Sequence, residues 1–66
     1  MNILLNSKPY EVEQNCTLTQ LLEALDQSPL GIAFAVDSVI IKRTEWDNFQ
    51  LKEGHRVTMI KAACGG

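Results

Sequence analysis

The spacing of hydrophobic residues changes along this chain and separates strand-like from helix-like segments. Residues 1–5 predict a strand, and alternation over residues 10–13 predicts a second strand that returns after a turn at Asn6-Ser7-Lys8-Pro9. Leucines then recur three and four residues apart, at positions 18, 21, 22 and 25, which is the spacing of one apolar helix face. Thr17, followed three residues later by Gln20, predicts a capping box at the start of this helix.

The second half of the chain returns to the pattern of strands. Pro29 and Gly31 end the helical segment, and residues 32–36 and 39–43 predict two strands joined by a turn at Asp37-Ser38. Residues 44–49 predict an irregular or single-turn segment, and residues 56–62 predict a last strand after a turn built on Gly54. The first and last strands are expected to be long and central.

This order of elements predicts an α+β fold with the β-grasp, or ubiquitin-like, architecture. One amphipathic helix covers only one face of a sheet, so we expect a mixed sheet of four or five strands with one main α-helix packed on one face. A ferredoxin-like fold needs a second helix, for which the pattern offers no segment.

Alternation along the strands assigns their residues to two faces of the sheet. The face toward the helix is expected to carry Ile3, Leu5, Phe34, Val36, Val57 and Met59. The opposite face is expected to be apolar and shallow where a solvated face would be polar, and it carries Leu4, Ala33, Ala35, Thr58, Ile60 and Ala62. A contiguous exposed apolar surface marks a partner site, so these six residues are predicted to form a partner interface. A register shifted by one residue would exchange the two faces.

Composition and charge narrow the class of protein. The 66 residues make one small domain, 45% of them hydrophobic, with a formal net charge of −2 and no basic run. Nucleic-acid binding, which depends on a basic surface, is therefore disfavoured. The longest apolar run, residues 31–36, is far shorter than the roughly 18 residues of a membrane span, and the first residues lack the pattern of a signal peptide. Two cysteines, Cys16 and Cys64, do not form a disulfide framework, so we expect a cytoplasmic protein with reduced thiols.

The body of the chain carries no recognisable set of catalytic residues. His55 stands beside the Gly54 turn with no nucleophile near it in sequence and is expected to be a solvated turn residue. One histidine and two distant cysteines do not supply the three or four ligands of a metal site, and the glycines form no phosphate-binding loop. Trp46 is expected to plug the edge of the sheet partially. We therefore expect no bound cofactor, no metal and no enzymatic activity of the chain itself.

The last residues, Ala63-Cys64-Gly65-Gly66, are predicted to form a flexible tail after a body of residues 1–62. Glycine has no Cβ, so Gly65 and Gly66 fit a channel too narrow for other residues. A terminal carboxylate is ionised and a poor electrophile, so it accepts a nucleophile only after activation, for instance as an acyl-adenylate. The chain shows no ATP-binding motif, so a separate enzyme must supply this activation. The pattern favours a carboxyl-terminal acyl carrier over a clipped or frayed terminus.

The whole chain resembles the ThiS family, the sulfur carrier proteins of thiamine biosynthesis, within the ubiquitin-like ThiS/MoaD superfamily. The resemblance rests on MNILLNSKPYEV at the start, on TLTQLLEAL in the helix, and on GIAFAVDSVIIKRTEW, in which Arg43 and Trp46 have the family's Arg-x-x-Trp spacing. The segment LKEGHRVTMI, followed by Cys64-Gly65-Gly66, completes it. Cys64 and His55 depart from the family pattern, which has a small inert residue and commonly an acid at these positions.

The resemblance implies a role for the tail. Gly66 would be adenylated by a ubiquitin-activating-like adenylyltransferase of the ThiF type, which uses ATP, and then converted to a thiocarboxylate, a 1-thioglycine. The sulfur would come from a persulfide donor such as a cysteine desulfurase and pass to a thiazole synthase of the ThiG type. Gly65 and Cys64 would thread the tail into these enzymes.

Three other functions remain open at the level of the sequence. A carrier for molybdopterin synthesis shares the fold, the tail and the chemistry, although the length of the chain and the spacing of Arg43 and Trp46 favour thiamine. A ubiquitin-like modifier would join Gly66 to lysines of other proteins through isopeptide bonds. A plain interaction domain would keep its function without Gly66.

Overall fold

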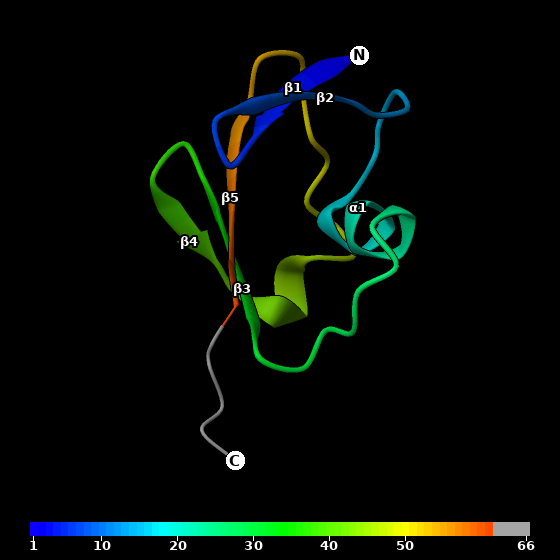
Figure 1. The fold of residues 1–66 in the computed structure, drawn as a ribbon. Helices are drawn as coiled ribbons and strands as arrows, with labels where there is room; N and C mark the ends of the chain where they lie inside the picture. Colours follow the sequence, from blue (N-terminus) through cyan, green and yellow to red (C-terminus); the bar gives the residue numbers. More distant parts are fainter. Residues whose placement is uncertain (62–66) are drawn as a thin grey trace.

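The computed structural model of this chain describes residues 1–61, which form five strands, one α-helix and one short 3-10 helix (Figure 1). The chain runs through β1 (Asn2–Leu5), β2 (Lys8–Glu11), α1 (Leu18–Ala24), β3 (Ile32–Val36), β4 (Val39–Ile41), η1 (Arg43–Glu45) and β5 (Arg56–Lys61). The predicted order of strands and helix is therefore confirmed. Cys64, Gly65, Gly66 and the predicted tail lie outside the described residues.

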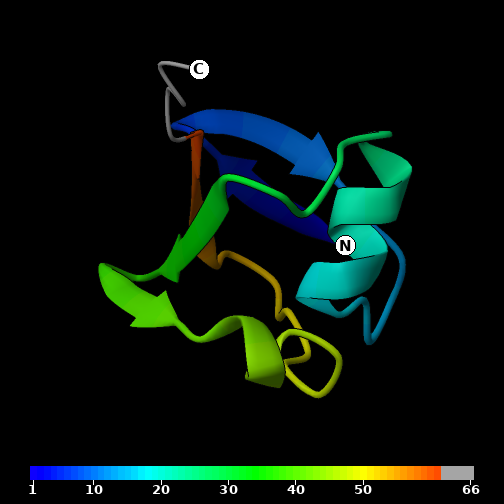
Figure 2. The ribbon, with the colours of Figure 1, turned by 90° about the horizontal axis from the view of Figure 1, so that it is seen from below.

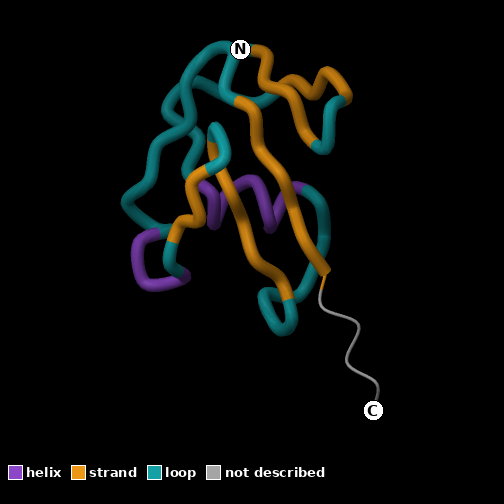
Figure 3. Tube along the Cα trace, turned by 90° about the vertical axis from the view of Figure 1, so that its left-hand side faces the viewer, coloured by secondary structure: helices purple, strands orange, loops and turns teal. Residues whose placement is uncertain are grey.

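The sheet has the strand order β2-β1-β5-β3-β4, with β5 in the centre. β1 and β5 are parallel, whereas the other neighbours are antiparallel, so the sheet is mixed as predicted. α1 packs on one side of the sheet, and Figure 3 shows the strands from the other side, in front of the helix. β5, with six residues, is the longest strand, but β1 has only four and is shorter than β3.

Two hairpins with the same kind of turn flank the central strand. Asn6 and Ser7 have φ values of 50° and 70°, and Asp37 and Ser38 have 50° and 71°. Positive φ at both central residues defines the type I′ turn, whose twist matches that of antiparallel strands. The first turn is therefore two residues long, shorter than predicted, and Pro9 lies in β2. Proline is tolerated there because β2 is an edge strand.

The helix begins as predicted and ends earlier. Thr17 accepts a hydrogen bond from the main-chain N–H of Gln20, and the side chain of Gln20 accepts one from the N–H of Thr17, which completes the capping box. At the other end, Asp26 takes φ 55°, and the N–H of Gln27 donates to the carbonyl of Leu22. This is the hydrogen bond of a Schellman motif, so the helix stops before Pro29.

The core lies between the sheet and α1, and the six residues predicted to face the helix all contribute to it. Four are buried, and Leu5 and Met59 are partly buried against the same cluster. The prediction for Trp46 was wrong. Its side chain is 4% exposed and belongs to the core, so it does not plug the edge of the sheet. Its ring packs edge to face on Phe34 at 4.9 Å between centroids, and its Nε1 donates to the carbonyl of Ile41 at 3.0 Å.

The segment between Trp46 and Leu51 is fastened to the start of the helix. The N–H groups of Leu18 and Thr19 donate to the carbonyls of Phe49 and Trp46, and the N–H of Leu51 donates to the carbonyl of Cys16 at 2.7 Å. The first N–H groups of a helix have no partner inside the helix, so this irregular segment satisfies them. Figure 2, a view from below, shows the helix to one side of the strands.

Candidate functional site

The face of the sheet that α1 leaves uncovered is the candidate site in the described residues; we call it the open face. Its members follow from the register, because residues paired across a ladder point to the same side. Ala33 pairs with Ile60, Ala35 pairs with Thr58, and Leu4 pairs with Arg56. The structure therefore brings together five of the six predicted interface residues: Leu4, Ala33, Ala35, Thr58 and Ile60. Ala62 lies outside the described residues, and the role of the whole set as an interface stays a prediction.

Exposure on the open face is uneven. Ile60 is 46% exposed, whereas Ala35 is only 7% exposed, so Ala35 is not the exposed contact residue that alternation suggested. Its methyl group is small and lies between Thr58 on β5 and Ile40 on β4, its partners across the two ladders. Ala35 thus forms part of the floor of the face rather than its contact surface.

One strongly exposed member of the open face, Ile40, was missed in the sequence. It is 62% exposed and pairs with Ala35, so it extends the apolar surface onto β4. The signal was present in the two-residue turn, which fixes the pairing of Val36 with Val39 and therefore of Ala35 with Ile40. Val39, the adjacent residue, is 60% exposed but lies on the side of the sheet that faces the helix.

The central strand is fixed on both sides before it reaches residue 60. On one side, the N–H of Asn6 donates to the carbonyl of Val57, and the N–H of Met59 donates to Oδ1 of Asn6 at 2.8 Å. Here the side chain of Asn6 replaces β1, whose pairing with β5 ends at Val57. On the other side, β3 pairs with β5 as far as Lys61. Ile60 is therefore held in place on the strand that leads to the predicted tail.

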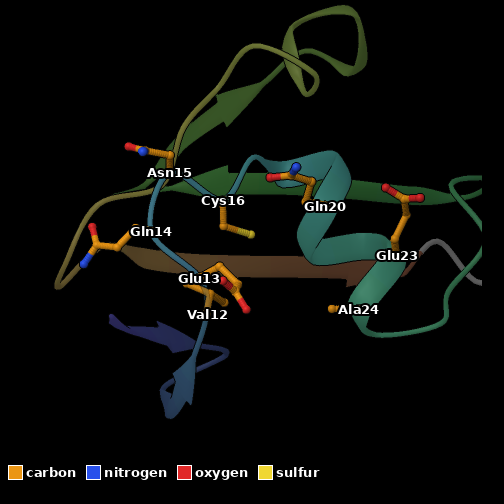
Figure 4. A pocket seen from close by; sticks show the side chains of 8 residues that line it. All are labelled: Val12, Glu13, Gln14, Asn15, Cys16, Gln20, Glu23 and Ala24. Carbon is orange, nitrogen blue, oxygen red and sulfur yellow. The ribbon is translucent and has the colours of Figure 1, made fainter.

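The buried thiol of Cys16 lies next to a groove on the helix side of the molecule (Figure 4). Its Sγ donates to the carbonyl of Thr17 at 3.3 Å. Burial raises the pKa of the Cys16 thiol, and the negative charge of Glu13 raises it further. A thiol with a raised pKa stays protonated near neutral pH and is a weak nucleophile, so Cys16 is suited to packing rather than to chemistry.

His55 has a structural place in the turn before β5. Its Nδ1 accepts a hydrogen bond from the N–H of Lys52 at 3.0 Å, and its ring lies 6.1 Å from that of Phe49. It is half-buried, and thus less exposed than the solvated turn residue that the sequence predicted. Within residues 1–61 no group of three or more histidine, cysteine, aspartate or glutamate side chains is placed to hold a metal ion. In the same residues no helix is long and apolar enough to cross a membrane.

Comparisons of the sequence and of the structure with known proteins find the same family. The model of the ThiS family matches residues 3–66 of this chain. The sulfur carrier protein ThiS of Escherichia coli (strain K12) is 30% identical over 66 residues, which are 100% of both chains. The crystal structure of the thiamine biosynthesis protein (ThiS) from Geobacter metallireducens is similar with a TM-score of 0.85 and 26% identity, covering 100% of both chains. A solution structure of a thiamine biosynthesis protein from the same organism has a TM-score of 0.79 and 26% identity, covering 100% of this chain and 88% of that one.

Proposed function

This chain belongs to the ThiS family, the sulfur carriers of thiamine biosynthesis, and from that membership we propose that its sulfur travels as a thiocarboxylate on Gly66. The observation that carries the proposal is the family match, which extends through Gly65 and Gly66. The open face supports it, because a carrier needs a surface by which enzymes recognise it, and Ile60 stands on the strand that leads to these glycines.

The proposed reaction begins with activation by a ThiF-type adenylyltransferase. The Gly66 carboxylate attacks the α-phosphate of ATP, pyrophosphate leaves, and a glycyl adenylate forms. The terminal sulfur of a persulfide, generated by a donor such as a cysteine desulfurase, then attacks the carbonyl carbon and displaces AMP. A second thiol cleaves the resulting acyl disulfide, which leaves the thiocarboxylate on Gly66 and a disulfide between the two thiols.

Each step requires reactive or activating groups that residues 1–61 of this chain do not supply. Activation raises the electrophilicity of a carboxylate that is otherwise ionised and unreactive. The carrier contributes a narrow main-chain end and a recognisable surface, while the enzymes contribute ATP, the persulfide and the acceptor. The thiocarboxylate then delivers its sulfur to a ThiG-type thiazole synthase. This acceptor distinguishes the proposed function from that of a carrier for molybdopterin synthesis.

Intact-mass measurement tests the proposal. Incubation with the cognate adenylyltransferase, ATP and a persulfide donor should raise the mass by the difference between one sulfur and one oxygen atom. A variant that lacks Gly66 serves as the control and should gain nothing. The loaded chain should then support thiazole formation with the cognate synthase. An unchanged mass for the complete chain, or stable conjugates to lysines of other proteins, would contradict the proposal.

A further inference from the structure

A small hollow lies at the end of the open face where β5 begins, far from Lys61. Its volume is about 230 Å³, and it lies between the two type I′ turns. The residues around it are Leu4, Ser7, Ser38, Arg56, Val57 and Thr58. Leu4, Arg56 and Thr58 are members of the open face, so the hollow is continuous with the apolar surface.

The chemistry of this hollow suits an anion. Three of its lining residues carry a hydroxyl group, one carries a guanidinium, and none carries a carboxylate. Arg56 is exposed, and within residues 1–61 it forms hydrogen bonds through its main chain alone: its N–H donates to Oδ1 of Asp37 at 3.0 Å, and its carbonyl accepts from the N–H of Asp37 at 2.8 Å. The guanidinium therefore has no partner in the described part of the chain, although the chain as a whole is acidic, with a net charge of −2.

A guanidinium offers several N–H donors in a flat fork that matches the two oxygens of a carboxylate. The hydroxyls of Ser7, Ser38 and Thr58 add donors around the same space. At protein interfaces, arginine is enriched among the residues that contribute most of the binding energy, and polar contacts surround an apolar centre. The hollow likewise places polar groups at the edge of an apolar surface, beside the exposed apolar residues of the open face.

We propose that the hollow receives a carboxylate side chain of the adenylating enzyme, which Arg56 binds in a two-pronged contact. This inference rests on the proposed function, because it names a contact by which that enzyme recognises the carrier. Arg56 and Ile60 are four residues apart on one face of a strand, a separation of about 13 Å at the usual rise per residue. The partner surface is therefore expected to present an apolar patch for Ile60 and an Asp or Glu side chain about 13 Å away from it.

Binding of variants to the cognate ThiF-type enzyme, measured by calorimetry, tests this contact. Arg56→Gln removes the charge and the fork while keeping a side chain of similar polarity. Lys8→Gln is the matched control, because it removes one positive charge from edge strand β2, where Lys8 pairs with Leu5 and therefore lies on the helix-facing side. Arg56→Gln should weaken binding roughly tenfold or more, as expected for a hydrogen-bonded charge contact, and Lys8→Gln should stay within about twofold. Arg56→Lys should restore only part of the affinity, because lysine lacks the fork.

Two outcomes would overturn the inference: an Arg56→Gln chain that binds like the unaltered chain, or a Lys8→Gln chain that loses as much affinity. Circular dichroism should show all three variants folded, since both side chains are exposed. Sulfur loading of the unaltered chain, followed by mass, reports separately on the proposed function. If the unaltered chain loads while Arg56→Gln binds normally, the hollow has another role and the carrier function stands.

Discussion

Two adjacent residues of β4 offer a sharp test of the open face as a docking surface. Ile40 and Val39 are almost equally exposed, at 62% and 60%, but they point to opposite sides of the sheet. Ile40→Asp places a charge on the open face, and Val39→Asp places the same charge on the side that faces the helix. If partner enzymes dock on the open face, only Ile40→Asp should impair them.

The expected size of the effect follows from the exposed fraction. Complete burial of an isoleucine side chain is worth about 1.5–3 kcal/mol, so covering the exposed 62% of Ile40 contributes about 0.9–1.9 kcal/mol. An aspartate at this position loses that gain and must also give up its hydration. Binding should therefore weaken about tenfold or more, since 1.4 kcal/mol corresponds to a factor of ten. Ile60→Asp, at 46% exposure, should behave in the same way.

Ile40→Asp and Val39→Asp are both expected to remain folded. Strand preferences span about 1 kcal/mol, whereas a domain of this length has a stability of roughly 3–10 kcal/mol at 0.05–0.15 kcal/mol per residue. The assay is steady-state adenylation with the carrier as the varied substrate. Loss of docking raises the KM for the carrier and leaves kcat unchanged. Equal KM values for Ile40→Asp and Val39→Asp, whether raised or not, would refute the assignment of the open face.

Three further predictions concern the body that presents this face. Thr17→Ala removes the cap of α1 and should lower the free energy of unfolding by about 1 kcal/mol in urea denaturation. Trp46→Phe removes the donor to the Ile41 carbonyl and leaves space in the core; we expect a loss of about 1–3 kcal/mol by the same measurement. The raised pKa of Cys16 means that the folded state favours the protonated thiol, so stability from this group is present below about pH 9 and is lost as pH rises further. Thermal melts from pH 8 to pH 10.5 should thus fall more steeply for the unaltered chain than for Cys16→Ala, and parallel curves would contradict this.

Patterns that depend on neighbours in sequence predicted most of the fold. The leucine spacing gave the buried face of α1, and the pairing of Thr17 with Gln20 gave its first residue, because both features act within one or two turns. Alternation assigned the six inward residues of the sheet, including Phe34 and Val57, which are almost fully buried. Two-residue periodicity holds wherever one face of a strand packs on a core, so these assignments needed no knowledge of the pairing.

The positions of Trp46 and Ala35 were predicted wrongly because they depend on contacts between distant segments. Trp46 enters the core because the segment that follows β4 folds back over Phe34 and the start of the helix, which no local period reveals. Ala35 is shielded by neighbours on two other strands, so alternation gave its direction but not its exposure. Asp26 ended the helix in a left-handed conformation that glycine adopts more readily, so the sequence placed the stop later, at Pro29 and Gly31. The need to activate the terminal carboxylate follows from its own chemistry, whereas the thiocarboxylate at Gly66 is implied by the family resemblance alone.

The fixed position of β5 limits where a partner enzyme can place its reacting centre. Hydrogen bonds from Asn6 and the ladder with β3 hold the strand as far as Lys61, so a partner that binds the open face also fixes the point from which residues 62–66 depart. Five residues reach at most about 17–18 Å when fully extended. The reacting centre of each enzyme must therefore lie within that distance of the docked Lys61. Within this radius, docking converts the encounter of Gly66 with that centre into an intramolecular event and raises its effective concentration. At carrier concentrations below the KM, the affinity of the open face then sets the rate of loading, although the proposed reacting group, Gly66, is not part of that face.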